Sequence, residues 1–454
     1  MNEVLNFIET NKDRFREELF EFLRIPSVSS DPEHDKDTEK CALWLSEHMK
    51  SIGLKDVRIY PTDGHPIVYA EDLSAGADAP TVMVYGHYDV QPVDPIELWE
   101  TPPFEPTIKN GKIFGRGTSD DKGQLFMHVK AIEAYFKTNT KLPVNIKFLI
   151  EGEEEAGSNH LDLFIEKNKE MLKCDTVLVS DTEWFADGMP SICYSLRGIS
   201  YIELTVTGPN RDLHSGTFGG GVDNPLNVLC WMIAKLKDQY GRVTIPGFYD
   251  DVLDLTKEER DGFKKLPFSE EEYCKDLDIN ATWGENGYTT LERVWARPTL
   301  DLNGIVGGYI GEGAKTVLPT KASAKISMRL VPYQKHDDIT AKAISYLKQI
   351  CPPTVNLVVK VLHGGNPVLM PIDSKGIRTA MEALKDAFNT DSVFMREGGS
   401  IPIVGEFFEV LNAPTVLMGM GLPGDNIHSP NESFAIDNFF GGIKASAYFM
   451  DKFK

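Results

Sequence analysis

The stretch EGEEEAGS, residues 151–158, places four glutamates within five positions directly after the apolar run VNIKFLI. An isolated acidic run of this kind is most simply a solvated turn. That interpretation weakens if other apolar runs of the chain end in similar side chains. Clustered carboxylates can then bind cations, and a carboxylate left unbound can accept a proton from water.

Three other apolar runs do lead into a histidine or a carboxylate. TVMVY is followed by His87, TVLVS by Asp181, and TVLMGMG, after several residues, by His428. An acidic pair, residues 120–121, lies in the glycine-rich segment GRGTSDDKGQ. Each of these residues alone has an ordinary interpretation as a surface histidine or a helix-capping aspartate. Ligands of open α/β sheets bind beyond the carboxyl ends of the strands, so four such endings predict a metal centre.

The kind of ligand indicates the metal. Imidazole and carboxylate without cysteine is typical of catalytic zinc, with manganese or cobalt as alternatives. Charge counting favours a pair of divalent ions, because three liganding carboxylates and a bridging hydroxide would neutralise both. Such pairs lower the pKa of a shared water molecule and polarise a carbonyl group during hydrolysis. One further carboxylate must then stay unliganded as the base, and the acidic stretch can supply both ligand and base.

The elements that position these residues alternate in type. Apolar strands and amphipathic helices follow one another through the first 200 residues and resume near the end, which predicts a doubly wound α/β domain with a mostly parallel sheet. Between them, ISYIELTVTG and KASAKISMRLVP alternate like half-exposed strands, and two helical patterns and the strand VNLVVKVLHGG follow. This order is that of a split βαβ, ferredoxin-like α+β domain. We expect a catalytic domain of residues 1–197 and 367–454, interrupted by an inserted domain of residues 198–366.

Composition limits the classes of partner. A chain of 454 residues with 41% hydrophobic residues is expected to form two globular domains. The net charge of −21 argues against nucleic acid or an anionic membrane as partner. Six dispersed cysteines without a CxxC pair predict reduced thiols. The N-terminal segment is expected to be one amphipathic helix and lacks the regions of a signal peptide, and no run approaches a membrane span. We therefore expect a cytoplasmic protein.

Nine motifs in chain order carry a resemblance to a known family. They are GHYDVQP, GRGTSDDKGQ, EGEEEAGS, SDTEWF with YSLRGI, DLHSG, GAKTVLP, SMRLVP, REGGSIP and NIHSPNE. Together they resemble the dinuclear-zinc metallopeptidases that include carnosinase, cytosolic Cys-Gly dipeptidase, glutamate carboxypeptidase and aminoacylase. The resemblance spans almost the whole chain, and the DLHSG and REGGSIP motifs are most similar to the carnosinase-like dipeptidase branch.

The resemblance implies a complete set of metal ligands. His87 and Asp181 would bind one ion, and Glu155 and His428 the other. Asp120 would bridge both ions, and the peptide bond that follows it would be cis. The implied cofactor is therefore two divalent ions per subunit, zinc first, with manganese or cobalt possible.

The resemblance also implies roles for two neighbouring carboxylates. Glu154 would be the general base and then the acid that protonates the leaving amine. Asp89, two residues beyond His87, would hold that imidazole in its ligating tautomer. Glu151 and Glu153 receive no role, and for them the solvated turn remains the expected structure.

The inserted domain resembles the lid and dimerisation domain of the family. His214, in DLHSG, would reach the active site of the neighbouring subunit and stabilise the oxyanion, although a surface-loop histidine is the alternative. Arg329 would bind the terminal carboxylate of the substrate with its fixed fork of donors, and its alternative is an exposed polar strand face. Thr316 and Ser400 are further candidates for substrate contact. A homodimer formed through the inserted domain is implied.

The predicted function is hydrolysis of the amide bond of dipeptides or small peptides by a metal-bridged hydroxide with a glutamate as general base. An N-acyl amino-acid deacylase or a carboxypeptidase of the same fold is the alternative within enzymes, because the metal centre would be the same. A non-catalytic binding protein on a hydrolase fold is the remote alternative. It would require the loss of Glu154 or of a ligand, and none of these residues is missing.

Overall fold

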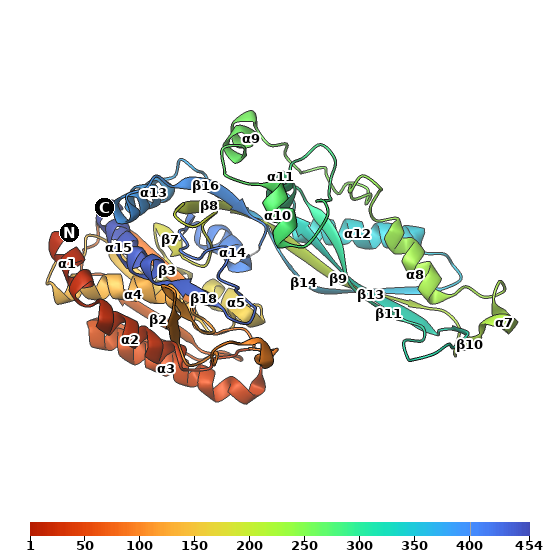
Figure 1. Ribbon diagram of the computed structural model, residues 1–454, viewed down its shortest axis with the longest axis horizontal. Coiled ribbons are helices and arrows are strands. Elements are labelled where there is room, and N and C mark those ends of the chain that lie inside the picture. Colours follow the sequence, from red (N-terminus) through yellow and green to blue (C-terminus); the bar gives the residue numbers. More distant parts are fainter. Residues whose placement is uncertain (400) are drawn as a thin grey trace. The chain divides into compact units, whose positions relative to one another are not determined.

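The computed structural model describes residues 1–399 and 401–454, and of Pro402 the backbone alone (Figure 1). The chain divides into two compact units. The first unit comprises Met1–Tyr194, Met370–Met395 and Glu406–Lys454, and the second comprises Ser195–Leu369 and Arg396–Gly405.

A nine-stranded sheet forms the centre of the first unit. Its four central strands are parallel neighbours, in the order β6 (Asn145–Glu151), β3 (Thr81–His87), β7 (Thr176–Val179) and β17 (Thr415–Leu417). Antiparallel strands flank them: β1 (Asp56–Tyr60) and β2 (Ile67–Asp72) on one side, and β8 (Ser191–Leu196) on the other. Strand β16 (Val393–Glu397) also pairs with β8, and β15 (Val368–Leu369), whose residues belong to the second unit, pairs antiparallel with the last two residues of β8. The predicted α/β fold with a parallel centre is confirmed, and the antiparallel flanks were not predicted.

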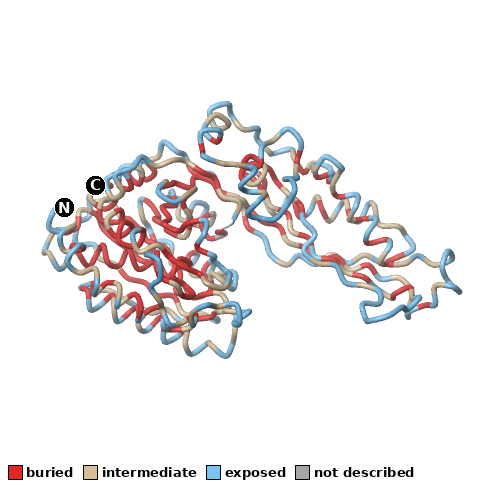
Figure 2. Tube along the Cα trace, viewed as in Figure 1, coloured by how far each residue is buried: buried red, intermediate tan, exposed pale blue. Residues whose placement is uncertain are grey.

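The central strands are buried along almost their whole length, as the red strands of Figure 2 show. Helices cover both faces of this sheet. On one face, the ring of Tyr85 lies 5.3 Å from that of Phe407 in α14 (Pro402–Leu411). The next residue, Gly86, faces the opposite side, where a Cβ would lie 3.1 Å from Leu125 of α4 (Lys122–Lys137). Burial on both faces explains why these strands read as continuous apolar runs.

The helices of the first unit are amphipathic or wholly buried. They are α1 (Asn2–Thr10), α2 (Lys12–Leu23), α3 (Asp35–Ile52), α4 (Lys122–Lys137), α5 (Leu161–Lys167), α6 (Lys169–Leu172), α13 (Lys375–Phe388), α14 (Pro402–Leu411) and α15 (Ile436–Lys452). A small sheet of β4 (Thr107–Lys109), β5 (Lys112–Phe114) and β18 (Ser433–Ala435) accompanies them. The prediction of one N-terminal helix was wrong, because the chain breaks at Asn11. Asn11 leaves the helical region with φ −111° and ψ 12°, and its side chain and its main-chain amide both donate to the carbonyl of Phe7, at 2.8 and 3.1 Å.

The second unit is built on a four-stranded antiparallel sheet in the order β11 (Thr299–Gly307), β13 (Lys321–Leu330), β9 (Gly198–Thr207) and β14 (Asn356–Gly365). In chain order its main elements are β9 (Gly198–Thr207), α8 (Pro225–Ala234), β11 (Thr299–Gly307), β13 (Lys321–Leu330), α12 (His336–Ile350) and β14 (Asn356–Gly365). This is the predicted split βαβ arrangement. Strand β11 had not been located in the sequence, and its register shifts between Leu302 and Gly304, which breaks the alternation.

Helices α8 and α12 cover one face of this sheet and form the core of the second unit. Every second residue of β13, from Ala322 to Leu330, is buried and faces these helices. Leu229 of α8 and Leu347 of α12 belong to the same buried cluster. The smaller elements are β10 (Leu213–His214), β12 (Val317–Leu318), α7 (Ser215–Phe218), α9 (Lys257–Phe263), α10 (Glu270–Asp276) and α11 (Thr290–Ala296). Across the described residues, no helix is both long enough and apolar enough to span a membrane.

Candidate metal centre

The metal-ligand candidates of the first unit gather at the carboxyl ends of the parallel strands. His87 is the last residue of β3 and lies opposite Glu151, the last residue of β6. The one-turn 3₁₀ helix Glu154–Ala156 follows β6, and Asp181 follows β7 by two residues. Because β3 is hydrogen-bonded to both β6 and β7, these three endings lie side by side.

Two groups of potential ligands form there, and Asp120 belongs to both: His87, Asp120 and Asp181 in one, and Asp120, Glu155 and His428 in the other. In the first group, His87 Nε2 lies 3.1 Å from Asp120 Oδ1 and 3.9 Å from Asp181 Oδ2. In the second, His428 Nε2 lies 2.9 Å from Asp120 Oδ2 and 3.2 Å from Glu155 Oε2. Asp120 therefore presents one carboxylate oxygen to each group.

These spacings fit the ligand shell of a metal ion. Zinc lies about 2.0–2.1 Å from nitrogen and oxygen ligands, so ligand atoms of a tetrahedral site are about 3.3 Å apart. The four distances above, from 2.9 to 3.9 Å, lie around that value. The donors are also of the kinds that zinc, manganese and cobalt accept in catalytic sites. The peptide bond between Asp120 and Asp121 is cis, as predicted.

The electrostatics of the two groups are those of a site with excess negative charge. Burial lowers the pKa of His87, but hydrogen bonds with Asp120 and Asp89 outweigh it and raise the pKa well above its ordinary value. Hydrogen bonds with Asp120 and Glu155 raise the pKa of His428 to about 11. Burial and the charge of Asp120 raise the pKa of Asp181 to about 7. Each shift has the direction that draws positive charge into the centre.

Asp89 organises the groups from behind. His87 Nδ1 lies 3.1 Å from the main-chain oxygen of Asp89 and 3.3 Å from its Oδ1. With Nδ1–H donating to Asp89, the lone pair of Nε2 is directed towards the first group. The same buried carboxylate accepts from the hydroxyl of Ser29 at 2.6 Å and from the amides of Glu154 and Glu155 at 3.3 and 3.1 Å. Asp89 thus fixes one ligand and the turn that carries two glutamates.

Glu154 lies next to the ligands but belongs to neither group. Burial raises the pKa of Glu154 well above its ordinary value, and the negative charges of Asp181 and Glu155 act in the same direction, against His87. An unliganded carboxylate with a raised pKa can accept and return a proton near neutral pH.

The other two glutamates of the acidic stretch are buried, so the expected solvated turn was wrong for both. Glu151 is 1% exposed and accepts hydrogen bonds from Tyr85 at 2.6 Å and Ser158 at 2.9 Å. Glu153 is 8% exposed and pairs with His160 at 2.8 Å. Tyr85, Ser158 and His160 therefore take the place of the water molecules that a solvated turn would have provided.

Three further side chains support the centre and were not singled out in the sequence. Gln91 donates to Glu155 Oε2 at 2.7 Å. Glu432 and Arg116 form a buried ion pair of 2.8 Å beside the Asp120 loop. All three lie within motifs of the resemblance, each four positions from a predicted ligand, whereas Ser29 carried no comparable signal.

The second unit contains the remaining candidates. His214 pairs with Val317 across β10 and β12, and the amide of Ser215 donates to the Thr316 carbonyl at 3.1 Å, so His214 and Thr316 are close together. His214 is exposed, and its Nδ1 accepts from the Gly216 amide at 3.1 Å. In the neutral ring the proton therefore lies on Nε2, which can donate to a ligand.

Arg329 lies on the face of β13 opposite the helices and is half-buried. Burial lowers its pKa from the ordinary value, and Arg329 in turn contributes, after burial, to a lowered pKa of His363 and of Arg197. The carboxylate of Asp301 acts in the opposite direction on both arginines, so the lowered pKa values arise mainly from burial. Ser400, the last candidate, lies outside the described residues.

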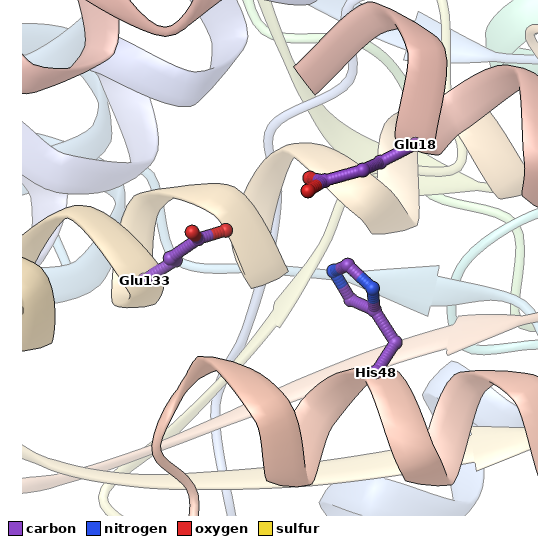
Figure 3. A group of neighbouring side chains, drawn as sticks. All are labelled: Glu18, His48 and Glu133. Carbon is purple, nitrogen blue, oxygen red and sulfur yellow. The ribbon is translucent and has the colours of Figure 1, made fainter. Parts of the chain in front are cut away.

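A third group of possible ligands, Glu18, His48 and Glu133, lies away from the strand ends. Figure 3 shows the three side chains pointing towards one another from separate helices. The ammonium group of Lys130 lies among them, 2.5 Å from Glu18, 2.6 Å from His48 and 2.8 Å from Glu133. The lysine therefore already supplies the cation, and we assign no metal to this group.

Comparison with known proteins places the chain in a family. Residues 83–452 match the peptidase family M20/M25/M40. The Cys-Gly metallodipeptidase DUG1 of Candida albicans is 35% identical, over 97% of this chain and 95% of the relative. The human Beta-Ala-His dipeptidase is 32% identical, over 99% of this chain and 92% of the relative.

A solved structure agrees with these sequence matches. The M20 metallo-carboxypeptidase Sso-CP2 from Sulfolobus solfataricus has a TM-score of 0.87 and 35% identity, with 97% of this chain and 99% of that one covered. The family match covers more than half of the chain, and the relatives match over nearly their full length. The chain is therefore a peptidase and belongs to the peptidase family M20/M25/M40.

Proposed function

We propose that the protein hydrolyses the amide bond of dipeptides or small peptides with two divalent ions held at the strand ends of the first unit. The observation that carries this proposal is the shared Asp120, which offers one oxygen to each ligand group beside a half-buried Glu154 that belongs to neither group. The dipeptidase activities named for the relatives support the same conclusion.

His87 and Asp181 would hold one ion, Glu155 and His428 the other, and Asp120 both. We propose zinc, because the donors are imidazoles and carboxylates at tetrahedral spacing, with manganese and cobalt as alternatives. When bound, the pair of ions would lower the pKa of a water molecule and polarise the scissile carbonyl group.

Side chains of the protein would then transfer the proton. Glu154 would take a proton from the attacking water and return it to the leaving amine. Its raised pKa supports both steps, since the carboxylate is then a better base and its protonated form remains accessible near neutral pH. Asp89 would keep His87 in the ligating tautomer through the contacts at Nδ1.

We assign substrate contacts to the second unit. Arg329 would bind the terminal carboxylate, a role supported by its half-buried guanidinium on the open face of the sheet. His214 would donate Nε2–H to the developing oxyanion in the site of a neighbouring subunit, with Thr316 beside it. Ser400 remains a prediction from the sequence.

We infer a homodimer formed through the second unit. Strand β11 is an edge of its sheet and exposes Leu302 and Ile305 (44% each) and Val306 (67%). An apolar edge strand favours pairing with the same strand of a second copy across a twofold axis. Trp231 of α8 is also exposed, at 48%. We place the protein in the cytoplasm, because its six cysteines are free, as in a reducing compartment.

A carboxypeptidase or an N-acyl amino-acid deacylase is the second candidate. The likeness to the carboxypeptidase from Sulfolobus, at 35% identity, favours the first of these. The metal centre is common to all three reactions, and the pocket for the N-terminal part of the substrate distinguishes them. A carboxypeptidase would accept longer or N-blocked peptides, whereas a dipeptidase would require a free amino group close to the scissile bond.

The test uses protein stripped of metal by a chelator and reloaded with zinc, manganese or cobalt. Initial rates are compared at equal enzyme concentration on Cys-Gly, β-Ala-His, an N-acetyl amino acid and an N-blocked dipeptide. We expect metal-dependent cleavage of the two free dipeptides. Faster cleavage of the blocked substrates would replace the dipeptidase assignment by the second candidate, and equal rates with and without metal would refute the metal centre.

A further inference from the structure

A buried carboxylate, Glu432, lies beside the centre and has no role in the chemistry proposed above. It is 0% exposed, follows His428 by four residues and immediately precedes β18. Strand β18 pairs with β5, and the main-chain oxygen of Glu432 accepts from the amide of Gly115 at 3.0 Å. Glu432 therefore lies where the segment carrying His428 meets the loop carrying Asp120.

The side chain of Glu432 receives four donors from that loop. Its Oε1 accepts from the amides of Ser119 at 2.9 Å and Asp120 at 3.1 Å. Its Oε2 accepts from the amide of Gly117 at 2.9 Å and from Arg116 Nη1 at 2.8 Å. The loop connects β5 to α4 without regular structure of its own, so these amides depend on a side-chain acceptor.

The same contacts exclude Glu432 as a metal ligand. Four donors occupy its two oxygens, and Arg116 neutralises its charge. Arg116 is itself held by the carbonyl of Pro92 at 3.0 Å and by the ring of Trp99, 5.4 Å from the guanidinium carbon. The pair is therefore a fixed anchor.

The other end of the His428 segment is attached to the same loop. Asp425 Oδ2 lies 3.3 Å from the hydroxyl of Ser119, and the amide of Ser433 donates to the Asp425 carbonyl at 2.8 Å. His428 lies at the tip of this closed segment, in the left-handed backbone region with φ 59°. The position of His428 is thus tied to the loop of Asp120 on both sides.

We propose that Glu432 is a positioning residue that couples the two ion sites. It holds the backbone of Asp120 so that the carboxylate can serve both ions, and it fixes the segment that brings His428 to the second ion. This inference rests on the two-metal centre proposed above. It makes the prediction that one change at Glu432 weakens both sites, although Glu432 touches neither ion.

The test measures zinc affinity in the full chain with a competing chromophoric chelator, without use of activity. In Glu432→Gln, an NH2 group replaces one oxygen and faces two of the four donors. We expect both zinc ions to bind about 10–100-fold more weakly, the usual effect of losing a group that orients metal ligands. Glutamine keeps the size of the side chain, so the change is in hydrogen bonding.

Glu285→Gln is the matched control. Glu285, in the second unit, is 8% exposed and accepts from Arg297 at 2.8 and 2.9 Å and from Arg242 at 3.1 Å. The Glu285→Gln variant should have a lower thermal unfolding temperature than wild type and the same zinc affinity. Equal loss of zinc affinity in both variants would reduce the effect to general destabilisation and overturn the proposal, as would unchanged affinity in Glu432→Gln.

Arg116→Gln keeps the inference testable if Glu432→Gln does not fold. It removes one donor and leaves the three amides on Glu432, so a smaller loss of zinc affinity is expected. Unchanged affinity in this variant would overturn the coupling role. The wild-type titration separates the two proposals: fewer than two zinc ions per chain would refute the metal centre itself, whereas two ions with unaffected variants would refute only the role of Glu432.

Discussion

Replacement of Glu154 by glutamine should remove turnover and leave the metal centre filled. Glu154 belongs to neither ligand group. Its main-chain N–H donates to Asp89, and this hydrogen bond is retained when the side chain is glutamine. The amide side chain keeps the shape but cannot accept a proton. A general base contributes about 10²–10⁴-fold, which corresponds to about 3–5 kcal/mol of transition-state stabilisation. We expect kcat to fall by this factor with a small change in KM.

The assay combines initial rates on Cys-Gly with zinc content by elemental analysis. Glu153→Gln is the matched control, because this neighbouring glutamate pairs with His160 and is absent from both ligand groups. The control should retain activity within a few-fold. Two results would refute the reasoning: Glu154→Gln with activity close to wild type, or Glu154→Gln that has lost its zinc, which would make Glu154 a ligand.

Asp120→Asn should lower the content of both ions, since one carboxylate is shared by the two groups, and normal metal content by elemental analysis would contradict the bridge. His214→Ala and Glu154→Gln, each nearly inactive alone, should recover about a quarter of wild-type activity when mixed as dimers, because about half of the dimers are mixed and one of their two sites is intact. Verified mixed dimers without activity would return His214 to a surface role. Burial raises the pKa of Glu151 from 4.5 to about 8, so its contribution to stability is complete below pH 4.5 and is lost as the pH rises to about 8. Glu151→Gln cannot ionise and should gain in thermal unfolding temperature relative to wild type between pH 5 and pH 8.5, whereas parallel curves would exclude the ionisation.

Features that depend on neighbouring residues in the chain could be predicted. The apolar runs of β3, β6 and β7 indicated buried parallel strands, and the polar residues after them indicated one edge of the sheet. The alternation of apolar and polar residues along β13 indicated a strand with one face packed on helices. The arrangement of the second unit was predicted from this pattern. Strand β11 was not predicted, because a register shift between Leu302 and Gly304 interrupts the two-residue alternation of its side chains. The break at Asn11 was not predicted, because the apolar residues on both sides of it keep helical spacing.

The sequence by itself determined the kinds of ligand, their order and their places at strand ends, because strand period and residue type are local properties. Only the tertiary structure decided which carboxylates are free of water. Glu151 and Glu153 look like solvated charges in the sequence, but their partners Tyr85 and His160 bury them. The attachment of the Asp120 loop to Glu432 was equally invisible, since more than 300 positions separate the two residues along the chain. Hydrogen bonds over such distances arise only when the loops meet, and no local pattern records them.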